Sequence, residues 1–109
     1  MVDLIQATDN SFDAQVLKCD LPVLTYFVAK WSGPAQKTAS ILAEIATEHE
    51  GRLKVVTLDI EASPVVTSNY SVLNIPTLIL FKNGQEVERI QGDVSRADLL
   101  EQVVPYVDY

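Results

Sequence analysis

The chain is poor in the residues that carry most metal and thiol chemistry. Its 109 residues include one cysteine, Cys19, and one histidine, His49. A single cysteine excludes an intramolecular disulfide, Cys-x-x-Cys chemistry and a cysteine-rich metal site. His49 stands in the polar run TEHEG with no set of ligand partners close by in sequence, so we expect it at a solvated helix end. The sequence therefore predicts neither a metal site nor another cofactor.

Basic residues and long apolar runs are also scarce. Eight Lys and Arg residues face fifteen Asp and Glu residues, which gives a formal net charge of −7 and argues against a nucleic-acid footprint. No apolar run approaches the roughly 20 residues that span a bilayer. The start MVDLIQATDN has neither a basic n-region nor an apolar h-region. We therefore expect a cytoplasmic monomer that binds neither nucleic acid nor membrane.

Hydrophobic residues are plentiful, at 48% of the chain, so residues 1–109 can form a single domain with a proper core. Apolar runs alternate with amphipathic stretches, which is typical of strands covered by helices. The patterns predict strands over 2–7, 21–29, 52–60, 77–82 and 85–91, and helices over 8–18, from residue 34, over 63–72 and over 96–107.

Local signals support these boundaries. A polar cap around Asp9 and Asn10 precedes the first helix. Asn83-Gly84 is a strong hairpin turn between the last two strands. Ser95, with an acidic residue three positions later, resembles a capping box at the start of the last helix.

This order of elements constrains the fold. Right-handed crossovers would make the early, helix-linked strands parallel, and the terminal hairpin adds antiparallel pairing. The run LPVLTYFVA is almost continuously apolar, as expected for a central strand buried on both faces. We predict an α/β protein: a three-layer α/β/α sandwich with a central five-stranded mixed sheet and four helices.

Three segments together point to a family. VLKCDLPVLTYFVAKWSGPA, NIPTLILFKNG and IQGDVS resemble thioredoxin in the same order and over essentially the full length, which implies the thioredoxin fold and protein-disulfide oxidoreductase activity. The family's active-site turn is Trp-Cys-Gly-Pro-Cys. Its first cysteine lies at a helix N-terminus, which favours the thiolate, and the second resolves the mixed disulfide. The matching positions here are Ser32 and Ala35, so this site cannot exchange disulfides.

Ser32 offers two interpretations. Its hydroxyl at a helix N-terminus is a conceivable nucleophile, but that role needs an adjacent general base and no histidine lies near it in the sequence. Capping the helix that begins at Pro34 is the favoured role. We therefore assign no catalytic residue.

The resemblance also implies a buried aspartate on the central strand and a lysine on the next strand, and the matching residues here are Tyr26 and Thr57. Joint loss of both charges is expected of a chain released from redox chemistry, because an unpaired buried charge is costly. Serine and alanine are also what deliberate removal of two cysteines would leave. Some active relatives carry an aromatic at the position of Tyr26, so an engineered form of a genuine disulfide reductase stays open.

What remains of the family's site is a partner-binding rim, which receives an extended peptide in relatives. The resemblance places six residues on it: Trp31, Gly33, Pro34, Ile75, Pro76 and Gly92. A cis bond before Pro76 would expose the backbone of Ile75 for pairing with a peptide; alternatively, Pro76 only sets the start of the strand. Trp31 is either an anchor for a partner or packs on its own turn.

The charge near Gly92 and the single cysteine bear on which partners and which chemistry we expect. Gln91 and Asp93 flank Gly92 where relatives tend to be apolar, so the rim should prefer neutral or basic segments. Cys19 lies outside the motif, and we expect a surface or half-buried bystander. The leading hypothesis is non-covalent protein binding. The alternatives are an inactivated disulfide reductase and a monothiol role for Cys19.

Overall fold

One apolar strand forms the centre of the sheet. The computed structural model describes residues 4–29, 34–92 and 95–107, with the side chains of residues 34–37 left out. The strand order is β1-β3-β2-β4-β5, so β2 is central. Strands β1, β3 and β2 are parallel to one another. Strand β4 is antiparallel to β2, and β5 is antiparallel to β4. The predicted five-stranded mixed sheet is confirmed.

The helices and strands follow the predicted order. The strands are β1 (Ile5–Ala7), β2 (Val23–Val28), β3 (Lys54–Asp59), β4 (Thr77–Lys82) and β5 (Gln85–Gln91). The helices are η1 (Asp13–Leu17), α1 (Pro34–Glu48), α2 (Pro64–Asn69) and α3 (Arg96–Val103), and the turn η2 (Val104–Tyr106) continues the last of them. The bounds of β4 and β5 agree with the sequence ranges residue for residue.

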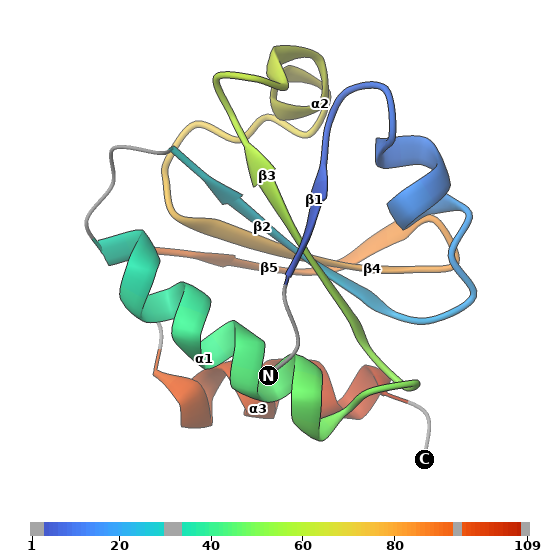
Figure 1. Ribbon diagram of the computed structural model, residues 1–109, viewed down its shortest axis with the longest axis vertical. Helices are drawn as coiled ribbons and strands as arrows, with labels where there is room; N and C mark the ends of the chain where they lie inside the picture. The colour runs from blue at the N-terminus through green and yellow to red at the C-terminus, as the bar shows by residue number, and fades with distance from the viewer. Residues whose placement is uncertain (1–3, 30–33, 93–94, 108–109) are drawn as a thin grey trace.

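Helices cover both faces of the sheet, which gives the predicted three layers. Figure 1 shows α1 and α3 together on one side, and η1 and α2 on the other. Leu42 of α1 and Leu99 of α3 belong to one buried cluster. Phe12 and Val66 belong to the second cluster, on the opposite face.

Strand β2 contributes to both clusters, because its successive side chains point to opposite faces. Leu24 and Tyr26 belong to the cluster with α1 and α3, whereas Val23 and Phe27 belong to the cluster with α2. All four side chains are buried. The prediction that this run is buried on both faces is therefore confirmed.

The first helix differs from its predicted form. Instead of a helix over 8–18, the structure has a five-residue π-helical turn, η1. The preceding residues form a tight turn in which the Thr8 amide donates to the Ser11 hydroxyl at 2.9 Å, a local bond that competes with helix formation. Asp9 does not cap this helix. Its carboxylate accepts hydrogen bonds from the amides of Val65 and Val66 at 3.2 and 2.9 Å, and so caps the distant helix α2.

The other two predicted local signals, the turn at Asn83-Gly84 and the cap at Ser95, are confirmed. Asn83 and Gly84 have φ angles of 54° and 79°, as a two-residue hairpin of the type I′ class requires. The Ser95 side chain accepts a hydrogen bond from the Asp98 amide at 3.1 Å at the start of α3. Gly84 has a second constraint, because a Cβ there would lie 3.1 Å from the carbonyl oxygen of Leu17.

Gly84→Ala should therefore destabilise the protein more than Gly51→Ala. Both glycines have φ near +80°, so each substitution costs about 1–2 kcal/mol for a left-handed backbone. Only Gly84 adds a close backbone contact, since a Cβ at Gly51 meets nothing within 4 Å. Urea unfolding of the two variants measures the difference, and equal losses would contradict the contact with Leu17.

Thr25→Val should stabilise the fold. Thr25 is fully buried, and its hydroxyl has no hydrogen-bond partner in the part of the chain that the structure describes. An isosteric apolar side chain removes that desolvated group, which should raise the free energy of unfolding by about 1 kcal/mol. Thr77→Val is the matched control, because the Thr77 hydroxyl donates to the Asn74 carbonyl. The control should lose stability, and a loss in both variants would refute the prediction.

Candidate functional site

The candidate residues that the structure describes gather at one edge of the sheet. Strands β2, β3 and β5 end at this edge and β4 begins there, because Phe27 pairs with Thr77 and Thr77 pairs with Gln91. Helix α1 begins after β2 at Pro34. Clefts at the carboxyl ends of parallel strands are the usual ligand sites of α/β sheets. We call this edge the motif edge.

Ile75, Pro76 and Gly92 meet at the motif edge. The Ile75-Pro76 peptide bond is cis, as one of the two sequence interpretations predicts. The Gly92 amide donates to the Pro76 carbonyl at 2.9 Å, and Gly92 has a φ of 82°. The side chain of Ile75 is half-buried against the cluster that contains Phe27. These three predicted rim residues are thus brought together on two adjacent strand ends.

The motif itself is described only in part. Trp31, Ser32 and Gly33 lie outside the described residues, so their predicted roles as anchor, cap and turn stay predictions. Pro34 and Ala35 are the first two residues of α1. The predicted position of Pro34 in the first turn of a helix is therefore confirmed.

The two positions that hold a buried charged pair in relatives are neighbours in this fold. Tyr26 of β2 pairs with Thr57 of β3 across the parallel ladder. Tyr26 is 1% exposed and packs in the cluster with Leu42 and Leu99, while Thr57 is half-buried. An aromatic ring and a threonine fill the space without a carboxylate or an ammonium group. This pair of neighbouring positions therefore holds neither the aspartate nor the lysine of relatives.

The single thiol and the single imidazole lie far from the motif edge. Cys19 precedes β2, whereas the motif follows it, and six extended residues span roughly 20 Å. The thiol is free and half-buried against the cluster on the α2 face, as predicted. His49 directly follows α1, whose fifteen residues separate it from Pro34 by about 22 Å. Neither side chain can serve as resolving thiol or general base at the motif.

The segment that leads to Ile75 is braced by an arginine of β5. Arg89 donates to the Tyr70 carbonyl at 2.6 Å and forms a two-pronged pair with Glu86. The hydrogen bond to Glu86 raises the pKa of Arg89, so the guanidinium stays charged. Burial, followed by the charges of Glu86 and Asp13, raises the pKa of Tyr70 and keeps its hydroxyl neutral. This brace holds the end of α2 against the sheet.

Sequence reasoning missed a surface beside the rim. Leu73 is 88% exposed, and with Ile60 and Val72 it lines a groove against α2 that has a volume of about 520 Å³. The signal in the sequence was Leu73 itself, in the run SVLNIP. This run lies between a short helix and a strand, and neither a helical nor an alternating pattern explains an apolar residue there. Its exposure depends on tertiary packing, so the pattern alone did not show it.

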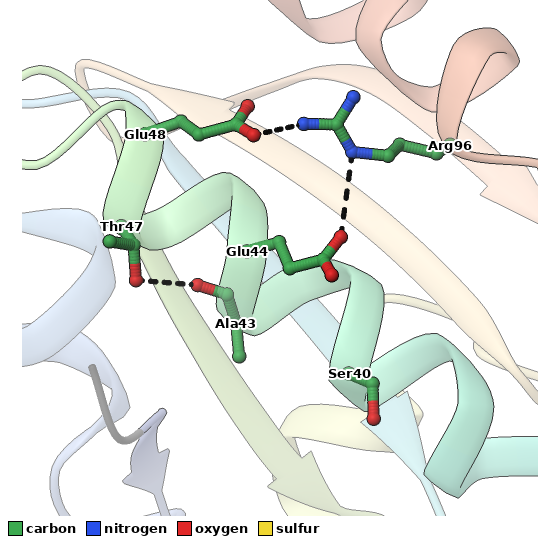
Figure 2. Close-up of a pocket in the computed structure, with 6 residues that line it drawn as sticks. All are labelled: Ser40, Ala43, Glu44, Thr47, Glu48 and Arg96. Atoms are coloured by element: carbon green, nitrogen blue, oxygen red, sulfur yellow. Dashed lines mark hydrogen bonds and ion pairs between the residues drawn. The ribbon is translucent and has the colours of Figure 1, made fainter. Parts of the chain in front are cut away.

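A second hollow lies between α1 and α3, away from the start of α1. Figure 2 shows Arg96 reaching toward two carboxylates one helical turn apart on α1. Its guanidinium pairs with Glu44 at 3.6 Å and with Glu48. Thr47 donates to the Ala43 carbonyl at 2.9 Å. These ion pairs join the first residue of α3 to α1. The charged side chains of this hollow therefore have a structural role.

In the described ranges, 4–29, 34–92 and 95–107, no group of three or more His, Cys, Asp or Glu side chains could hold a metal ion. None of the helices in these ranges has the length and apolar character that crossing a membrane demands.

Comparison with known proteins gives a consistent result. The family model for thioredoxin matches residues 3–104. The chain is 46% identical over 99 residues to thioredoxin of Mycobacterium tuberculosis, covering 91% of this chain and 85% of that protein. It is 43% identical over 94 residues to thioredoxin 1 of Nostoc sp., with coverages of 86% and 88%. Thioredoxin of Synechocystis sp. is 39% identical over 102 residues, with coverages of 94% and 95%. The chain therefore belongs to the thioredoxin family, without the pair of cysteines in the family's motif.

Proposed function

We propose that this chain binds partner proteins non-covalently and performs no dithiol–disulfide exchange. The observation that carries the proposal is the placement of its one thiol. Cys19 lies at the opposite end of β2 from the motif, while the two motif positions are Ser32 and Ala35.

Exchange needs two thiols in one site. A thiolate attacks a disulfide sulfur and releases one partner thiolate, and a second thiol must then attack the mixed disulfide to release the other. The reaction leaves the protein oxidised by two electrons as an internal disulfide. A chain with one cysteine cannot hold that product. Attack by Cys19 would stop at a mixed disulfide with the partner.

The rim supports the binding role. Ile75, Pro76 and Gly92 are fixed at the motif edge by a backbone hydrogen bond and by the packing of Ile75. An extended partner segment would add its main chain beside Ile75, and Trp31 would contribute an aromatic anchor. Pre-organised contacts of this kind reduce the entropy lost on binding. The partner is thus a protein or an extended peptide.

The setting of this role is part of the proposal. A protein with one free, half-buried cysteine suits a reducing compartment, so we place the chain in the cytoplasm. We further propose that it acts as a monomer, without a metal or other cofactor.

A second candidate is a disulfide reductase whose two motif cysteines have been replaced. The retained cis bond before Pro76 and the helix that begins at Pro34 favour it, since both belong to the site of active relatives. The neutral neighbours Tyr26 and Thr57 oppose it. Restoring the cysteines separates the two candidates.

The variant Ser32→Cys/Ala35→Cys should reduce insulin disulfides on the order of a hundredfold or more slower than an active relative. Positioned proton transfer contributes about that much to a rate, and Tyr26 and Thr57 supply neither a carboxylate nor an amine. The assay measures insulin reduction with dithiothreitol, and separately with a thioredoxin reductase and NADPH. The same variant with Cys19→Ser is the control for the remote thiol.

Turnover equal to that of the active relative would contradict the binding proposal and favour the replaced reductase. Adding Tyr26→Asp and Thr57→Lys to the restored variant should raise its rate, because the pair then supplies a proton acceptor and its counter-charge. Thermal unfolding of each variant shows whether the buried pair is tolerated.

Trp31→Ala should reduce the capture of partner proteins by immobilised protein. Loss of a central aromatic anchor costs about 2 kcal/mol or more, which is roughly a thirtyfold loss of affinity. Quantitative mass spectrometry of proteins retained from a cell extract measures the change. Val104→Ser is the matched control, because Val104 is an exposed apolar residue after α3. Equal retention of partner proteins by wild type and Trp31→Ala would contradict the proposal that the rim binds partners.

A further inference from the structure

Helix α2 depends on other parts of the fold for its order. It has six residues, Pro64–Asn69, and its sequence PVVTSN contains no strong helix former. Isolated helices of fewer than about 12 residues are marginal in water. Among the described residues, Ser63 gives α2 no capping hydrogen bond through its side chain, and a proline has no amide to donate. The order of α2 must therefore come from contacts with distant residues.

The turn after β1 holds the start of α2. The Asp9 carboxylate accepts hydrogen bonds from the Val65 and Val66 amides at 3.2 and 2.9 Å. These amides belong to the first turn of α2, where a helix has no carbonyl partners of its own. Figure 1 shows the chain passing beside α2 after it leaves β1. A side chain 57 positions before Val66 thus supplies the cap that Ser63 does not.

The same turn also holds the end of α2, through Phe12. The Phe12 ring lies against the rings of Tyr70 and Phe81, with centroid distances of 5.5 and 5.6 Å. Tyr70 is the C-cap residue of α2, and its ring lies 5.1 Å from that of Phe81 in β4. Tilted and edge-on pairs of this kind are favourable beyond the area that they bury. Residues 9–12 therefore contact α2 at both of its ends.

A short segment connects α2 to the rim. Residues 71–74 join the end of α2 to Ile75, and the Val72 amide donates to the Thr67 carbonyl of α2 at 3.0 Å. Ile75 packs against the same buried cluster that contains Phe12. Because coupling between sites passes through packed side chains and hydrogen bonds, a displacement of α2 would reach the residues before the cis bond.

We propose that Asp9 is a positioning residue for the partner-binding rim. By capping α2 from the turn after β1, its carboxylate holds residues 71–74 and the Ile75-Pro76 bond in the arrangement that receives a partner. The inference rests on the proposed binding function and adds a remote residue that controls the order of the rim. A rim that is already ordered loses less conformational entropy on binding. Loss of the cap leaves the fold intact and opens α2 and the rim locally.

Amide hydrogen exchange, followed by NMR on the full chain, tests this coupling. In Asp9→Ala, the amides of Tyr70, Val72 and Gly92 should exchange about fivefold or more faster, as loss of a helix cap predicts. Each of these amides donates to a backbone carbonyl and not to Asp9. Their exchange therefore reports the order of α2 and of the rim. Unchanged exchange at Gly92 in Asp9→Ala would overturn the proposal.

Two further variants separate positioning from general stability. Asp9→Asn keeps an oxygen that can accept a hydrogen bond from an α2 amide, so exchange at Gly92 should return to within about twofold of wild type. Gly51→Ala is the matched destabilised control, because it strains a residue with a φ of 83° between α1 and β3. It should lower the midpoint of urea unfolding without faster exchange at Gly92. Equal acceleration in Gly51→Ala and Asp9→Ala would assign Asp9 to general stability alone and overturn the proposal.

Phe12→Leu tests the second contact, and it replaces Asp9→Ala if that variant does not fold. The substitution keeps an apolar side chain and removes the ring contacts with Tyr70 and Phe81. Faster exchange at Gly92 supports control of the rim by residues 9–12. Exchange at Gly92 equal to that of wild type counts against it.

Retention of partner proteins separates failure of this inference from failure of the proposed function. Asp9→Ala should retain less of the proteins that Trp31→Ala loses, and Asp9→Asn should retain them. A loss in Trp31→Ala with unchanged retention in Asp9→Ala overturns the inference and leaves the rim in place. Unchanged retention in both Trp31→Ala and Asp9→Ala counts against the proposed function, and exchange at Gly92 then decides whether Asp9 orders this edge.

Discussion

The pairing of β2 with both of its neighbours is the constraint on which the rest of the structure depends. β2 is parallel to β3 and antiparallel to β4, and Phe27 lies opposite Leu58 on one side and Thr77 on the other. This register sets where α1 begins after β2 and where the cis bond precedes β4. Because side chains alternate between faces, a slip of one residue would exchange the two buried clusters. Burial on both faces of β2 therefore fixes the motif edge.

The backbone of the candidate site forms without the cysteines that carry out disulfide exchange in relatives. The cis bond, the hydrogen bond from Gly92 to Pro76 and the start of α1 at Pro34 all arise from strand register and backbone conformation. Tyr26 fills core space beside the half-buried Thr57, and neither is an aspartate or a lysine. A fold of this kind can lose thiols and proton relay together while the surface that meets a partner stays formed.

Local patterns predicted most of the fold, and distant contacts account for what they missed. The bounds of β4 followed from an apolar run, and those of β5 followed from the hairpin turn at Asn83-Gly84, whose positive φ angles favour that sequence. The predicted first helix was too long, because Thr8 and Ser11 form a hydrogen bond with one another. Asp9 caps a different helix, through the amide of a residue 57 positions away. The rim residues next to the ends of β4 and β5 were predicted through family resemblance. Leu73 was not, because its exposure depends on how α2 packs.

The edge position of β1 has a consequence for synthesis on the ribosome. β1 is synthesised before the other described strands, yet its neighbour in the described sheet is β3, with Ala7 paired to Leu58. Residues 54–59 must therefore leave the exit tunnel before β1 can pair. The carboxylate of Asp9 finds its partners later still, since the amides that it caps belong to residues 65 and 66. Strand β1 and Asp9 are thus ordered by segments that are synthesised later, and closure of the domain follows the emergence of α2.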